Sequence, residues 1–221
     1  TLAKEAQAKK VPLFTVDYDG EPRSALGYMF LAPLALVQKL GLVSDKSGQV
    51  AEALSSLEGM AASLAPSVPS ARNPAKTLAK DLHGRIAVVY GAGYFGAVAR
   101  RWKTQINENS KSWAFWETLP ELHHNSVVGY SLPREMANLG LVVMVQASGL
   151  HPQVVKRYQI TRELLDQQKT PHRTVEGRGS SPLSQMLTAI HLGDYVSYYL
   201  ALLNNVDPAP VPTITYIKSH L

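Results

Sequence analysis

The second half of the chain alternates short apolar runs with longer helical segments, and this alternation restricts the fold more than any other feature. The apolar runs are continuous, which is typical of strands buried on both faces of a parallel sheet. Strands separated by helices also favour a parallel arrangement. We therefore predict an α/β fold, a doubly wound parallel sheet flanked by helices. The predicted strands are residues 85–90, 112–117, 141–145 and 173–176. The predicted helices are 76–83, 152–168, 182–204 and 211–221, and residues 91–107 are predicted as a loop followed by a helix.

A proline-rich segment at residues 65–74 separates this pattern from the first part of the chain. Three of its residues are prolines, which cannot all continue one regular element. Upstream the pattern predicts mostly helices, with one short buried strand at 11–16 and a helix from 23 to 40 that Pro33 interrupts. The sequence thus predicts two parts, residues 1–74 and residues 75–221.

Charge and cysteine content exclude several classes of protein. The 22 Lys and Arg exceed the 17 Asp and Glu by a net charge of +5, but no basic block typical of a nucleic-acid binder is present. A modest positive charge favours a small anionic ligand. The absence of cysteine excludes disulfides and thiolate metal sites. The most apolar stretch, residues 25–37, is shorter than the ~20 residues of a membrane span. We expect a cytoplasmic globular protein that binds neither nucleic acid nor membrane.

One glycine motif indicates a cofactor-binding alternative. Residues 91–96 read G-x-G-x-x-G directly after a predicted strand, the context of a dinucleotide-binding turn. Glu117 lies close to where such a motif requires an acidic residue. The same glycines also suit a tight strand-to-helix turn in any doubly wound fold, and this second interpretation is favoured. An NAD-binding enzyme that uses Gly91 and Gly96 stays open as an alternative.

Two polar clusters contain candidate acid/base groups. Glu108 lies among Asn107, Asn109 and Ser110, whose hydrogen bonds could hold a carboxylate as a general base. On spacing alone, the cluster is better explained as a helix C-terminal cap with a solvated carboxylate. Further on, His123 and His124 are adjacent, so their side chains point to different sides and at most one is expected to transfer protons. Neither cluster has the spacing of a metal site, and we predict none.

Several blocks, in consistent order along the chain, resemble the bifunctional phosphoglucose/phosphomannose isomerases, which have the SIS (sugar isomerase) fold. The resemblance implies an SIS-type sheet in residues 75–221, preceded by a mostly helical remnant of a first SIS subdomain. The matching blocks are EPRSALG at 21–27, YGAG at 90–93, ARRWKTQINENSK at 99–111, LPELHHN at 119–125, LGDYVSYYLA at 192–201 and DPAPVP at 207–212.

The resemblance also implies an activity and roles for four residues. These enzymes interconvert glucose 6-phosphate or mannose 6-phosphate with fructose 6-phosphate through a cis-enediol, without metal or cofactor. Glu108 would move the proton between C2 and C1, and His124 would open the sugar ring with help from Lys218. Arg23 would bind substrate and stabilise the enediolate oxygen. A homodimer is implied, with the active site at the interface and the histidine reaching across from the neighbouring subunit.

The chain departs from the family pattern in three places. Ala92 stands where the family often has Ser, and Ser126 stands where an acidic residue is common. The Gly-Ser turn and the Ser/Thr-rich loop that cradle the phosphate in a first SIS half have no match. We therefore expect the C-terminal portion of such an enzyme. A non-catalytic module that binds sugar phosphates stays open as the alternative.

Overall fold

The computed structural model describes residues 2–221, which form two compact units divided between Lys46 and Ser47. The first unit contains α1 (Leu2–Ala8), the 3₁₀ turn η1 (Pro22–Ser24) and α2 (Leu26–Lys39). The buried strand predicted at 11–16 is wrong, because this segment lies outside any strand and Val11, Leu13 and Phe14 are exposed. A strand needs a neighbouring strand for its backbone hydrogen bonds, and these residues have none.

The second unit begins with two helices joined by the proline-rich segment. These are α3 (Ser47–Leu64) and α4 (Pro74–Leu82), with the 3₁₀ turn η2 (Ser70–Arg72) between them. Asn73 fixes the connection: its side-chain oxygen accepts from the backbone N–H groups of Ala75 and Lys76, and its amide donates to the carbonyl of Leu64 at 3.0 Å. The segment is thus a capped turn inside the second unit. The division into residues 1–74 and 75–221 stays a prediction.

The predicted parallel sheet is confirmed. Its four strands all pair in parallel, in the order β2-β1-β3-β4. Strand and helix alternate along the chain as the sequence predicts. The elements are β1 (Ile86–Ala92), α5 (Phe95–Ser110), β2 (Ala114–Leu119), β3 (Gly140–Gln146), α7 (Pro152–Gln167), β4 (His172–Glu176) and α8 (Pro182–Leu203).

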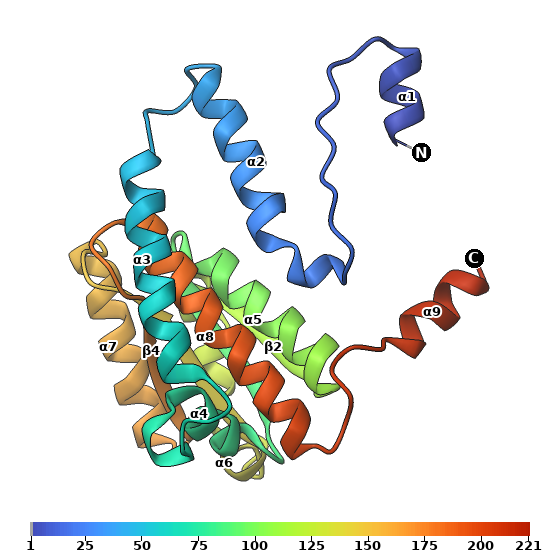
Figure 1. The fold of residues 1–221 in the computed structure, drawn as a ribbon. Helices are drawn as coiled ribbons and strands as arrows, with labels where there is room; N and C mark the ends of the chain where they lie inside the picture. The colour runs from blue at the N-terminus through green and yellow to red at the C-terminus, as the bar shows by residue number, and fades with distance from the viewer. Residues whose placement is uncertain (1) are drawn as a thin grey trace. The chain divides into compact units, whose positions relative to one another are not determined.

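Helices cover both faces of the sheet, as expected for a doubly wound fold. On one face, Val89 and Val143 pack beneath α3, α4, α5 and α8, and α8 lies between α3 and α5 (Figure 1). On the other face, Val142 and Met144 pack against Tyr158 of α7. Neighbouring residues of one strand point to opposite faces, so the continuous apolar runs serve two cores at once.

Shorter elements complete the second unit. The 3₁₀ turns η3 (Glu121–His124) and η4 (Ser126–Ser131) follow β2, α6 (Met136–Leu139) precedes β3, and α9 (Pro212–Ser219) ends the chain. Within residues 2–221, none of the helices combines the length and apolar character that crossing a membrane requires.

Candidate functional site

Glu108 lines an open cavity where the end of α5, the start of β2 and the start of α9 meet. The cavity has a volume of about 750 Å³, within the range of small-molecule sites. One wall is aromatic: Trp113 and Phe115 are 75% and 51% exposed, and their rings lie edge to face at 6.2 Å. Polar side chains share the cavity with Glu108, namely Lys103, Asn107, Lys111, Ser112 and Thr213. A carboxylate, cations and an aromatic wall therefore surround one space.

The end of α5 is fixed by hydrogen bonds that also anchor the C-terminal segment. Lys111 adopts the left-handed conformation (φ 55°) that ends the helix, and its ammonium donates to the carbonyls of Glu108 at 2.5 Å and Pro208 at 3.2 Å. The Asn107 amide donates to the carbonyl of Ser112 at 2.8 Å. The predicted helix cap is thus formed by Asn107 and Lys111, while Glu108 lines the cavity.

His124 lies in a turn where the neighbouring side chains form hydrogen bonds, while its own side chain is exposed to solvent. It is exposed at the end of η3, whereas His123 is half-buried and hydrogen-bonded to Thr161 of α7 at 2.9 Å. On the other side, the Asn125 amide donates to Glu121 at 3.1 Å. The two imidazoles therefore point in different directions, as predicted, and only His124 is open to a ligand or a partner.

A carboxylate lies beside Ser126, although this position lacks the acidic side chain that the resemblance leads one to expect. The Ser126 hydroxyl donates a short hydrogen bond to the Glu117 carboxylate, which β2 supplies. The hydroxyl also lies 3.0 Å from the Asn125 side-chain oxygen, which accepts from the Ser126 backbone N–H at 2.7 Å. The turn after His124 therefore contains an acidic group supplied by the neighbouring strand.

Within the second unit of one chain, the structure does not bring Glu108, His124 and Lys218 together. Glu108 lies before the amino end of β2 and His124 beyond its carboxyl end, so the length of the strand, about 17 Å, separates them. The first turn of α9 lines the Glu108 cavity, but Lys218 lies exposed in the last turn of that helix. Arg23 belongs to η1 of the first unit, where it pairs with Glu21 at 3.1 Å.

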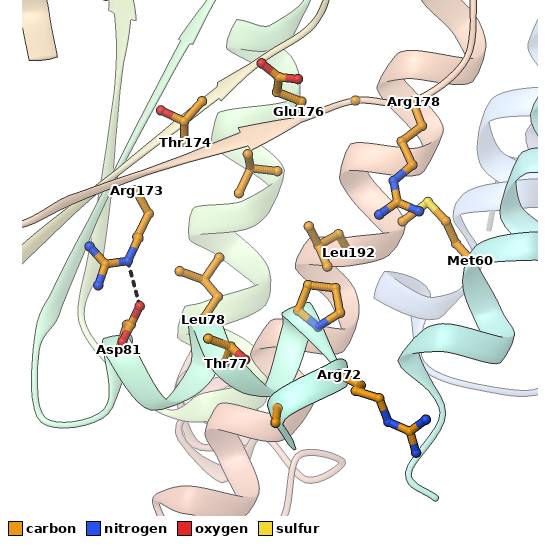
Figure 2. Close-up of a pocket in the computed structure, with 14 residues that line it drawn as sticks. Met60, Arg72, Thr77, Leu78, Asp81, Arg173, Thr174, Glu176, Arg178 and Leu192 are labelled. Carbon is orange, nitrogen blue, oxygen red and sulfur yellow. Dashed lines mark hydrogen bonds and ion pairs between the residues drawn. The ribbon is translucent and has the colours of Figure 1, made fainter. Parts of the chain in front are cut away.

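A second cavity, of about 890 Å³, lies along the free edge of β4. Three arginines line it, but they do not converge on one point. Arg173 forms an ion pair with Asp81 at 2.7 Å, Arg178 lies on the opposite side of the groove, and Arg72 points away from both (Figure 2). This groove therefore lacks the convergent polar groups of a binding site.

The glycine motif after β1 is explained by packing. A Cβ atom on Gly91 would lie 2.2 Å from the carbonyl oxygen of Phe95, and one on Gly96 would lie 2.9 Å from the Thr118 methyl group. Only glycine permits these close approaches of strand, turn and helix. The motif is thus the tight strand-to-helix turn that the sequence analysis favours.

A buried glutamine occupies the crevice where a doubly wound sheet ordinarily binds a ligand. Gln185 of α8 is 3% exposed and accepts from the Tyr94 hydroxyl at 2.9 Å. Its amide donates to the carbonyls of Ser148 and Gly179, both at 3.1 Å. These partners follow β1, β3 and β4, so one side chain joins the three loops at the carboxyl edge. The NAD-binding alternative has no support from this geometry.

Comparison with known proteins assigns the family. The family model described as "Bacterial phospho-glucose isomerase C-terminal SIS domain" matches residues 71–221, well over half of the chain. The chain belongs to this SIS-domain family. It is 36% identical over its whole length to the bifunctional phosphoglucose/phosphomannose isomerase of Caldicellulosiruptor bescii, and 35% identical to that of Aquifex aeolicus. It spans 65% and 64% of the lengths of these two relatives.

A solved structure supports the SIS fold independently. A glucose-6-phosphate isomerase-like protein from Thermus thermophilus superposes with a TM-score of 0.67 at 23% identity, covering 80% of this chain and 58% of that protein. At this identity the likeness establishes the fold alone. The predicted SIS-type sheet and the family resemblance are therefore both confirmed.

Sequence reasoning missed several residues around the candidate site. Lys103 lies four residues before Asn107 on α5, and this spacing could have placed it in the cavity beside the predicted cluster. Nothing in the sequence connects His123 with Arg157 and Thr161, which are 34 and 38 residues away. The sequence singled out Glu117 only as the acidic residue that follows the glycine motif. Its hydrogen bond with Ser126 forms because the turn between the two residues brings them together.

Proposed function

We propose that the protein is an aldose–ketose isomerase that interconverts glucose 6-phosphate or mannose 6-phosphate with fructose 6-phosphate. Membership of the family and the names of the two relatives support this proposal. The observation that carries it is the position of Glu108 on an open cavity of a size that accommodates a hexose phosphate. None of the four predicted site residues, in contrast, lines the groove along β4.

The proposed chemistry is one proton transfer along the sugar chain. The Glu108 carboxylate removes the proton from C2 of the open aldose, and the electrons move to the C1 oxygen, which gives a cis-enediolate. A proton passes from the C2 hydroxyl to the C1 oxygen through the cis-enediol. Return of the abstracted proton from Glu108 to C1, as the C2 oxygen becomes the carbonyl, gives the ketose. We assign ring opening to His124 with help from Lys218, and stabilisation of the enediolate oxygen to Arg23, whose charge is permanent.

The separation of Glu108 from His124 leads us to propose a homodimer. If both act on one sugar, His124 must come from a second copy, because β2 separates the two residues within a chain. β2 is an edge strand, and the neighbouring Trp113, Phe115 and Trp116 are exposed. Exposed aromatic side chains on an unpaired edge are typical of an interface. A cytoplasmic location stays a prediction.

A coupled assay tests the proposed activity. Purified protein is supplied with fructose 6-phosphate, and glucose 6-phosphate and mannose 6-phosphate are detected separately. We expect both products. Saturable binding of fructose 6-phosphate without formation of either product would support the non-catalytic module instead and contradict the proposal.

Mixing two inactive variants tests the shared site. Glu108→Gln and His124→Asn subunits are each expected to be inactive when alone. After they are unfolded together and refolded, hybrid dimers would contain one site with both natural residues, so about a quarter of all sites would be restored. Activity that stays at the level of the separate variants would contradict a site shared between subunits.

A further inference from the structure

His123 connects η3 to α7 through two hydrogen bonds, one at each ring nitrogen. Nε2 lies 2.9 Å from Oγ1 of Thr161, and Nδ1 lies 3.2 Å from a guanidinium nitrogen of Arg157. Both partners belong to α7, on adjacent turns. His123 and Arg157 are half-buried and Thr161 is fully buried, so the contacts are partly shielded from water.

The partners permit only one protonation state of His123. The Thr161 hydroxyl donates its hydrogen to the carbonyl of Arg157 at 2.8 Å, so Oγ1 can only accept from the imidazole. The guanidinium of Arg157 can only donate, so Nδ1 must accept. The imidazole is therefore neutral, with its proton on Nε2. Burial in particular, and then the charge of Arg157 and the neighbouring His124, lower the pKa of His123 in accordance with this state.

We propose that His123 is a positioning residue, fixed as the neutral Nε2–H tautomer between Arg157 and Thr161, and that this contact holds η3 so that His124 projects toward the partner subunit. The proposal rests on the proposed function, because it gives the position of His124 a role in the reaction. The opposite tautomer would place an N–H group against the Arg157 guanidinium and a lone pair against the lone pairs of Thr161. η3 has no covalent connection to α7 nearby, so loss of these bonds would leave its last turn less restrained.

The tautomer can be measured directly in the wild-type protein. Two-bond ¹H–¹⁵N correlation spectra at pH 7 distinguish Nε2–H, Nδ1–H and doubly protonated imidazoles. We expect the Nε2–H pattern for His123, and Thr161→Val is expected to convert it into a mixture of tautomers. A dominant Nδ1–H or a charged ring in the wild-type protein would overturn the proposal.

Kinetics then test whether the contact matters for the reaction. Valine matches threonine in shape, so Thr161→Val is expected to fold and to lower kcat roughly 10–100-fold through misplacement of His124, with little change in KM. Thr161→Ser restores the acceptor and is expected to recover most of kcat. The matched control is Thr104→Val, because the Thr104 hydroxyl bonds only to the carbonyl of Arg101 in its own helix, at 2.8 Å. Equal losses in Thr104→Val and Thr161→Val would overturn the proposal.

The failure of the proposed function can be distinguished from the failure of this inference. If His124→Asn retains full turnover, His124 has no part in the reaction, and a positioning role for His123 is overturned with it. If His124→Asn is inactive while Thr161→Val disturbs the tautomer and leaves kcat unchanged, the proposed function stands and only the positioning role is overturned.

Discussion

Glu108→Gln is expected to lower kcat by about 10²–10⁴-fold, the contribution of a positioned acid/base group. Glutamine has nearly the size of glutamate, so it should occupy the cavity with the same contacts, but its amide cannot accept the C2 proton. KM for fructose 6-phosphate should change little, since the substrate is bound by the rest of the cavity and not by the abstracted proton. Initial rates in the coupled assay, together with a circular dichroism spectrum that verifies folding, provide the measurement.

The control for this variant is Glu58→Gln. Glu58 is an exposed glutamate on α3, away from the cavity that Glu108 lines, and its replacement changes the net charge of the protein by the same amount. It should leave kcat and KM unchanged. If Glu108→Gln retained wild-type turnover, or if both variants lost activity equally, Glu108 would not be the group that transfers the proton.

The fold could be predicted from the sequence because each element carries a local signal. The continuous apolar runs of β1 and β3 identify strands with two buried faces. The strand predicted at 11–16 failed because apolar composition alone does not supply a neighbouring strand. Which strands pair with one another is a property of the whole fold and cannot be determined from a short stretch of sequence.

The site could be predicted only in part, for the same physical reason. The resemblance singled out Glu108 and His124, but it did not place them at opposite ends of β2. The side chains that bond to the residues beside His124 come from η3, β2 and α7, which are brought together only by folding. Gln185 is a further case, because its hydrogen bonds join loops that are 91, 37 and 6 residues away.

Trp102→Ala is expected to cause the largest loss of stability, about 3–5 kcal/mol. The indole is 1% exposed and packs between α5 and α8, where a Cβ atom on Gly193 would lie only 2.4 Å from it. Its Nε1–H donates to the carbonyl of Ala189 at 2.9 Å. Alanine would leave a cavity in the centre of the larger core and would remove the hydrogen bond to the Ala189 carbonyl, so both effects act in the same direction. The midpoint of urea denaturation, at an unchanged m-value, measures the loss.

Leu54→Ala is the control, because it also truncates a large apolar side chain to Cβ, at a position on α3 that is 51% exposed. Its free energy of unfolding should stay within about 0.5 kcal/mol of the wild-type value. Trp102→Phe adds a third comparison: it keeps a buried six-membered ring but loses the rest of the indole and the hydrogen bond to Ala189. Its stability should therefore fall between those of the other two variants. Equal losses for Trp102→Ala and Leu54→Ala would contradict the structure, because the contact of Trp102 with Gly193 would then contribute nothing to the packing of α5 on α8.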